Sequence, residues 1–138
     1  MGFISSLFEG GGKSGKKLIE ASKSGDTKTV KSLLAASADT NARDSHGWTA
    51  LMHASGNGRT GVAELLLNQG AEVNATDKDG WTALMRASEK GHFRVTAMLL
   101  NQGAEVNVKD NTGGTALLRA SGNRHSMVAE LLKRHGAS

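Results

Sequence analysis

A six-residue segment, Gly-Trp-Thr-Ala-Leu-Met, occurs at residues 47–52 and again at residues 80–85, 33 positions later. A related segment, Gly-Gly-Thr-Ala-Leu-Leu, follows at residues 113–118 after the same interval. A chain with an internal period of this length stacks copies of one structural unit, and each copy contacts only its neighbours. The period therefore predicts an elongated array with an extended surface, and it gives no reason to expect a catalytic pocket.

The repeats divide the chain into a flexible amino-terminal segment, expected at residues 1–15, and a repeat domain at residues 16–138. An alanine recurs every 33 residues from Ala21 to Ala120, which sets four copies in register. The first copy acts as an N-terminal capping repeat and the last as a C-terminal capping repeat. The predicted copies cover residues 16–43, 44–76, 77–109 and 110–138.

Polar residues mark both ends of this array. Ser32 in the first copy replaces the leucine or methionine of the later copies, and Lys133 in the last copy replaces a leucine. A stack of repeats needs a polar outer face at each end to stay soluble. We therefore expect a complete, capped and monomeric array.

Each copy has the residues of two short helices and a turn. Thr49 is expected to begin a helix, because its hydroxyl can accept a hydrogen bond from an amide of the first turn. Leu51 and Ala54 are spaced i, i+3 and share one buried face. A second apolar helix ends at Gly70, and Asp and Gly in residues 77–80 predict a turn. The expected unit is helix, turn, helix and protruding hairpin, in an all-α fold.

The sequence resembles the ankyrin repeat family over residues 16–138. The resemblance rests on Gly-x-Thr-Ala-Leu in three copies and on Leu-Leu-Leu-Asn-Gln-Gly-Ala-Glu-Val-Asn at residues 65–74, which nearly recurs at residues 98–107. It implies an ankyrin-repeat solenoid of helix-turn-helix units with protruding β-hairpin loops. It also implies a non-enzymatic protein–protein interaction scaffold that binds its partner through hairpin tips and a concave groove.

The chain departs from the family pattern at several positions. The usual Thr-Pro-Leu-His is replaced by Thr-Ala-Leu-Met in the second and third copies, so Met52 and Met85 are expected to supply apolar filling only. Ser37 and Arg124 replace glycines that are expected to follow helices. If these two residues are left-handed, each costs about 1–2 kcal/mol relative to glycine.

The family's binding surface corresponds here to the hairpin tips and the ends of the first helices. Trp48 and Trp81 directly follow turn glycines, where no helix stripe requires them, and tryptophan is frequent at binding hot spots. Alternatively, the two tryptophans stack on each other and shield the turns. The expected partner-binding residues are Ser45, His46, Trp48, His53, Asn57, Lys78, Asp79, Trp81, Arg86, Glu89, Lys90, Asn111, Thr112, Arg119 and Asn123.

Three of these residues, His53, Arg86 and Arg119, lie 33 positions apart on the first helix of each copy. If they point into the groove, they favour an acidic protein surface or peptide as the partner. The other interpretation pairs them with nearby acids such as Asp79, Asp44 and Asp110.

The sequence gives little support to catalysis. None of the five histidines belongs to an His-Glu-x-x-His motif, and cysteine is absent, so zinc ligands lack their usual spacing. We predict no catalytic residue, no cofactor and no metal. Absence of cysteine and of a recognisable signal peptide leads us to expect a cytoplasmic protein.

The amino-terminal end suggests an alternative function. Residues 1–34 contain six lysines but three acidic residues, and Phe3, Ile4, Leu7 and Phe8 form a short apolar stretch. A peripheral adaptor could use this end to bind anionic lipid or nucleic acid, although we favour a protein partner over a nucleic acid or a membrane. A third interpretation is a consensus-like engineered array without a natural partner.

Overall fold

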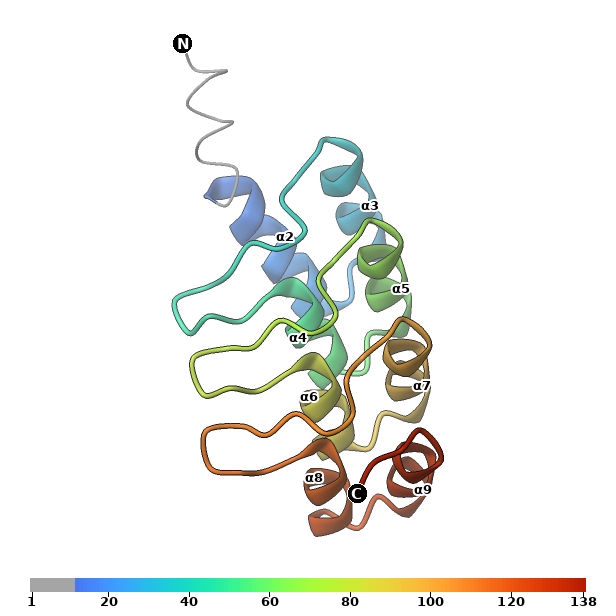
Figure 1. The fold of residues 1–138 in the computed structure, drawn as a ribbon. Helices are drawn as coiled ribbons and strands as arrows, with labels where there is room; N and C mark the ends of the chain where they lie inside the picture. The colour runs from blue at the N-terminus through green and yellow to red at the C-terminus, as the bar shows by residue number, and fades with distance from the viewer. Residues whose placement is uncertain (1–11) are drawn as a thin grey trace.

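The computed structural model describes residues 12–138, which form eight helices arranged as four consecutive pairs (Figure 1). No regular β-strand occurs within these residues. The pairs are α2 (Lys13–Ser24) with α3 (Thr27–Ala35), α4 (Ala50–Gly56) with α5 (Thr60–Asn68), α6 (Ala83–Lys90) with α7 (Phe93–Asn101), and α8 (Ala116–Gly122) with α9 (Ser126–Arg134).

The helices stack in two rows. The first helices of the pairs, α2, α4, α6 and α8, form one row, and α3, α5, α7 and α9 form the other. Loops between pairs project to the left of α4, α6 and α8 in Figure 1, away from the second row. The core lies between the rows and consists mainly of buried Leu, Val and Ala. This arrangement confirms the predicted all-helical repeat fold.

The first helix begins earlier than expected. Residues 1–11 of the predicted flexible segment lie outside the described residues, but α2 already begins at Lys13. Gly15 is buried, and the amide of Lys16 donates to the carbonyl oxygen of Gly12 at 2.9 Å. Helix α2 thus starts about one helical turn before residue 16, because helical hydrogen bonds extend into the glycine-rich sequence.

The expected threonine caps are present. Thr49 Oγ1 accepts a hydrogen bond from the amide of Met52 at 3.2 Å, and the same bond recurs at the start of α6 and of α8. Met52 and Met85 are each only 1% exposed and fill the core. Met52 does more than the apolar filling expected of it, because its Sδ also accepts a hydrogen bond from the amide of Thr49 at 3.4 Å. The equivalent Leu118 is 59% exposed, because within residues 12–138 α8 packs mainly against α6 and α9.

One equivalent position in each later copy fastens it to the preceding copy. Arg59, His92 and His125 each reach back to the last turn of the preceding first-row helix. Their side chains lie 2.9–3.1 Å from a backbone carbonyl oxygen there. Gly91, with φ 74°, makes room for this contact, because a Cβ atom there would lie 2.5 Å from Nδ1 of His125. His125 is partly buried in this contact.

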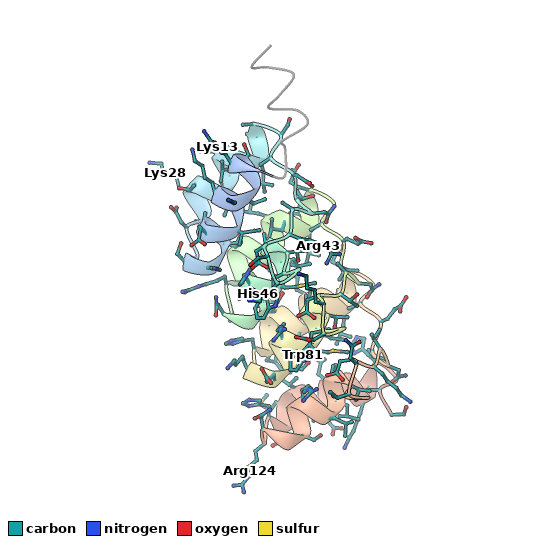
Figure 2. All side chains as sticks on the ribbon, turned by 90° about the vertical axis from the view of Figure 1, so that its left-hand side faces the viewer. Lys13, Lys28, Arg43, His46, Trp81 and Arg124 are labelled. Atoms are coloured by element: carbon teal, nitrogen blue, oxygen red, sulfur yellow. The ribbon has the colours of Figure 1, made fainter. Side chains whose placement is uncertain are left out.

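Two non-glycine residues have the left-handed conformation anticipated from the sequence. The φ angle is 65° at Ser37 and 63° at Arg124. Arg124 lies at the end of the molecule away from Lys13 (Figure 2). Glycine with a positive φ occupies the position equivalent to Ser37 after α5, α7 and α9, and the position equivalent to Arg124 after α2, α4 and α6. The first and last copies therefore each carry a local backbone strain of about 1–2 kcal/mol.

Asparagine side chains join the arms of successive hairpins. Asn74 Oδ1 accepts from the amide of Glu105 at 2.8 Å, while its Nδ2 donates to the carbonyl oxygen of Gly103 at 3.2 Å. Asn41 and Asn107 accept in the same way from the next arm. None of the helices within residues 12–138 is long and apolar enough to cross a membrane.

Candidate functional site

Each hairpin tip is organised around a single aspartate. The side chain of Asp77 is fully buried, and its Oδ1 accepts from the amides of Asp79 at 2.8 Å and Trp81 at 3.0 Å. The amide of Asp77 donates in turn to the carbonyl oxygen of Trp81 at 3.0 Å. Asp44 and Asp110 make equivalent bonds in the neighbouring loops. The aspartate thus holds the residue after the turn glycine in place at the start of the first-row helix.

The second carboxylate oxygen of each aspartate contacts a basic side chain of the following helix. Arg86 Nη2 lies 2.5 Å from Asp77 Oδ2, and Arg119 pairs in the same way with Asp110. In the second copy His53 Nε2 lies 2.8 Å from Oδ2 of Asp44. The interpretation in which the three basic residues pair with nearby acids is therefore observed. The partner of Arg86, however, is Asp77 and not Asp79.

The same three basic residues stack on the tryptophans. The guanidinium carbon of Arg86 lies 3.8 Å from the ring centroid of Trp48 and 4.2 Å from that of Trp81. The guanidinium of Arg119 covers Trp81 at 4.3 Å, and the rings of Trp48 and His53 are 4.6 Å apart. The tryptophans are stacked, but through Arg86 and not on each other. We call this row, which runs His53, Trp48, Arg86, Trp81 and Arg119, the aromatic–cation ladder.

Hydrogen bonds and burial shift two pKa values in the second copy, each in a different balance. Burial opposes ionisation of Asp44, but bonds from His53 and from the amides of Trp48 and His46 outweigh it and lower the pKa of that carboxyl. Burial also lowers the pKa of His53, although its bond to Asp44 and the nearby negative charge oppose this effect. His53 is therefore a neutral member of the ladder at neutral pH, whereas the two arginines are charged.

The pKa of Asp110 is lowered more strongly. Burial opposes its ionisation, yet the carboxylate accepts bonds from the hydroxyl of Thr112, the amide of Gly114, the guanidinium of Arg119 and the amide of Thr112. Hydrogen bonds to a charged carboxylate favour its ionised form. Together these donors keep the pKa of Asp110 well below its usual range.

The ladder borders a hollow of about 530 Å³ on the side of the hairpin tips. Figure 2 shows His46 and Trp81 on this side of the molecule. Six of the residues predicted from the sequence line the hollow, joined there by Lys23 and Asp44, which sequence reasoning did not select. The six are His46, Trp48, His53, Lys78, Asp79 and Arg86.

Other predicted residues lie along the same row of loops and helix ends, and several of them join one copy to the next. Lys78 Nζ donates to the carbonyl oxygen of Ser45 at 2.7 Å, and Asn111 Nδ2 donates to that of Lys78 at 3.0 Å. Asn57 Nδ2 lies 3.4 Å from the carbonyl oxygen of Lys23. The remaining predicted residues, Glu89, Lys90, Thr112 and Asn123, are exposed or partly exposed.

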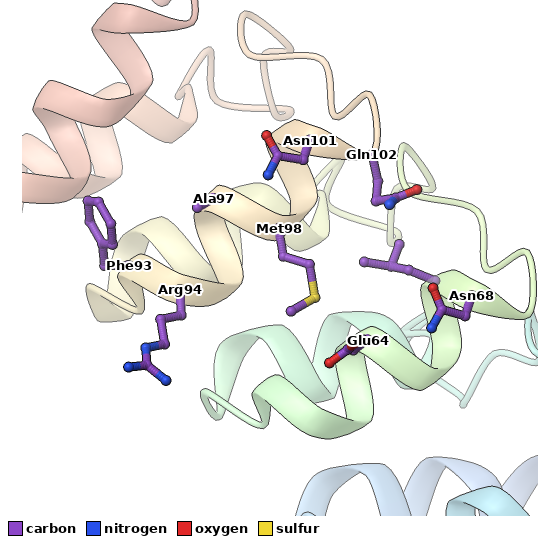
Figure 3. A pocket seen from close by; sticks show the side chains of 9 residues that line it. Glu64, Asn68, Phe93, Arg94, Ala97, Met98, Asn101 and Gln102 are labelled. Carbon is purple, nitrogen blue, oxygen red and sulfur yellow. The ribbon is translucent and has the colours of Figure 1, made fainter.

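A second hollow, of about 430 Å³, lies between α5 and α7 on the other row (Figure 3). The sequence alone does not indicate this hollow, because its lining combines two helices that are 33 residues apart. Met98 and Phe93 supply apolar surface, and Glu64 and Arg94 supply charge. Within residues 12–138 no group of three or more His, Asp or Glu side chains is placed to hold a metal ion.

We predict that His53→Arg makes the protein less sensitive to mild acid. Because His53 has a lowered pKa in the folded protein, the unfolded chain binds a proton first as pH falls through about 6.5, and the free energy of unfolding decreases. Arginine at position 53 stays charged and can pair with Asp44, so this decrease in the free energy of unfolding is removed. The further loss of stability below about pH 4, which comes from protonation of Asp44 and Asp110, remains.

The measurement is the urea midpoint of unfolding at about pH 7.5 and about pH 5.5. His46→Arg is the matched control, since it replaces an exposed imidazole on the same loop. An equal midpoint change with pH in wild type and His53→Arg would contradict the assignment.

Comparison with known proteins gives one family. A family model described as ankyrin repeats (3 copies) matches residues 18–110 and, in an overlapping second match, residues 76–138. A comparison with curated proteins gave no match.

Proposed function

The chain belongs to the ankyrin repeat family, whose repeats generally bind other proteins, and from this we propose that it is a non-enzymatic scaffold. Its partner protein would bind along the hairpin tips and first-row helices, against the aromatic–cation ladder. The observation that carries the proposal is the ladder itself. It places two partly exposed tryptophans beside a hollow of about 530 Å³ in a fixed orientation.

A fixed tryptophan is a favourable binding residue. Binding normally costs about 0.5–1.5 kcal/mol for each flexible side chain that becomes immobilised. Trp48 lies between His53 and Arg86, and Trp81 lies between Arg86 and Arg119, so both rings are already held. Their large apolar area can therefore be covered by a partner with little further loss of conformational freedom.

The ion pairs refine the expected chemistry of the partner. Arg86 and Arg119 are neutralised by buried aspartates, so they are poorly placed to bind acidic groups of another molecule. We propose that an acidic partner segment would instead meet the exposed Lys78 and Lys90 at the edges of the groove. A monomeric state and a cytoplasmic location remain predictions.

The test uses proteins captured by the full chain from cells of its source, followed by titration with the purified partner. We expect Trp48→Ala to weaken that partner's binding about 30-fold or more, as for a hot-spot residue. Phe93→Ala is the matched control, because Phe93 is an exposed aromatic residue on the second row of helices. Circular dichroism of both variants verifies folding. Binding that survives Trp48→Ala but not Phe93→Ala would place the interface outside the groove.

A further inference from the structure

The first helix pair carries a concentration of exposed lysines. Lys13, Lys16 and Lys17 lie on α2, where their i, i+3 and i+4 spacing places them on one side of the helix. Lys28 and Lys31 lie on α3 with the same i, i+3 spacing. Figure 2 shows Lys13 and Lys28 projecting from the same end of the molecule. We call these five exposed lysines the basic end.

Carboxylates in this helix pair are engaged elsewhere. Glu20 pairs with Lys23 at 3.3 Å, and Asp26 accepts from the amide and hydroxyl of Thr29 at the start of α3. Of the ion pairs formed within residues 12–138, none involves a lysine of the basic end. Asp26 also interacts with the nearby charge of Lys28, but residues 12–35 hold six lysines and two acidic residues, so the described helix pair balances only part of this positive charge.

The lysines are placed where they do not favour helix stability. The first turn of α2 contains no acidic residue, and Gly12 provides no side-chain cap, although a helix N-terminus favours negative charge. Like charges at i, i+3 and i+4 add a further unfavourable interaction. Lys17 also corresponds to Ala50, which is buried against the preceding copy. A soluble end would require only polar residues at these places, so the uniform positive charge suggests an external anionic surface.

We propose that the basic end docks on an anionic lipid bilayer. The apolar Phe3, Ile4, Leu7 and Phe8 precede these lysines directly in the sequence. Stable attachment to a membrane surface usually needs two signals, and an apolar segment beside a polybasic patch supplies both. This inference concerns a surface separate from the aromatic–cation ladder and does not depend on the protein-binding proposal.

Two features favour a bilayer over a nucleic acid. The six basic residues before Arg43 are all lysines, and this part of the sequence contains no arginine and no histidine. Arginine is the side chain best suited to two-point contacts with phosphates in nucleic-acid recognition, whereas lysine acts as a point charge on an anionic surface. In addition, the four apolar side chains at residues 3–8 have a use in the interfacial region of a bilayer and none along a phosphate backbone.

The experiment is co-sedimentation of the full chain with phosphatidylcholine vesicles that contain or lack phosphatidylserine, at low and at physiological salt. We expect binding only to the phosphatidylserine vesicles, and weaker binding as salt rises. The triple variant Lys13→Gln, Lys16→Gln and Lys17→Gln should bind about 100-fold more weakly, since each lysine near an anionic surface contributes about fivefold.

A matched triple variant removes the same charge elsewhere. Lys109→Gln, Lys133→Gln and Arg134→Gln replace exposed residues of the last two copies, and this protein should bind like wild type. Equal losses in the two triple variants would show that only net charge matters and would overturn the proposal. The proposal would also be overturned if wild type failed to bind phosphatidylserine vesicles at low salt. This holds whether or not the protein binds a single-stranded oligonucleotide that is added as a competitor.

Discussion

Replacing Asp77 with alanine is expected to lower the free energy of unfolding by about 3–5 kcal/mol, the usual cost of leaving one member of a buried ion pair alone. The Asp77 side chain is fully buried and pairs with Arg86, whose own side chain is only 15% exposed. The change also removes the acceptor for the amides of Asp79 and Trp81. Since a domain of this size has about 5–15 kcal/mol of stability, the loss would be a large share of it.

Asp79→Ala is the control, because it removes the same charge from the same turn. Asp79 is exposed, and the contacts described for it use its backbone, so its loss should change stability by about 0.5 kcal/mol or less. Urea unfolding followed by circular dichroism and by tryptophan fluorescence measures both variants, and Trp81 reports directly on Arg86. If the two variants unfold at the same urea concentration, the Asp77–Arg86 pair does not stabilise the fold as described.

Gly91→Ala is expected to destabilise the protein by about 2–3 kcal/mol. Part of this cost, about 1–2 kcal/mol, comes from a left-handed alanine, because φ at Gly91 is 74°. The rest arises because the new Cβ would lie 2.5–2.8 Å from ring atoms of His125. The ring must move, and its hydrogen bond to the carbonyl oxygen of Glu89 is lost, at a cost of about 1 kcal/mol.

Gly103→Ala separates the two causes. Gly103 is also left-handed, with φ 89°, but a Cβ there would meet no atom within 4 Å. It should therefore lose only about 1–2 kcal/mol, measured by the same unfolding curves. A double-mutant cycle with His125→Ala completes the test. The cost of Gly91→Ala should fall to that of Gly103→Ala when His125 is absent, and an unchanged cost would refute the steric explanation.

Much of the fold was predictable because each copy repeats the same local signals. Thr49 and its equivalents cap the first-row helices, and the left-handed conformations of Ser37 and Arg124 follow from the glycines that they replace. These features involve residues close together in the chain, so a single sequence contains the information. The period then extends them to every copy.

The site was predictable only in part. The sequence singled out Trp48, Trp81 and the basic residues of the first helices, and the structure brings them together. It did not indicate that Arg86 would lie between the two tryptophans, or that His125 would fasten one copy to the next. The contacts of Arg86 with Trp48 and of His125 with Glu89 join residues 38 and 36 positions apart, and their geometry depends on how two copies stack.

The sequence by itself determined the repeating helix pair, the number of copies and the surface that carries Trp48, Trp81 and the basic residues of the first helices. It could do so because the 33-residue period, the threonine caps and the turn glycines are local signals. Only the tertiary structure decided which charges remain available to a partner. Asp77 and Asp79 lie two residues apart in one turn, and either could pair with Arg86 on the basis of sequence. The turn buries Asp77 beneath the guanidinium of Arg86 and leaves Asp79 exposed. The reason is that the backbone amides of Asp79 and Trp81 donate to the carboxylate of Asp77.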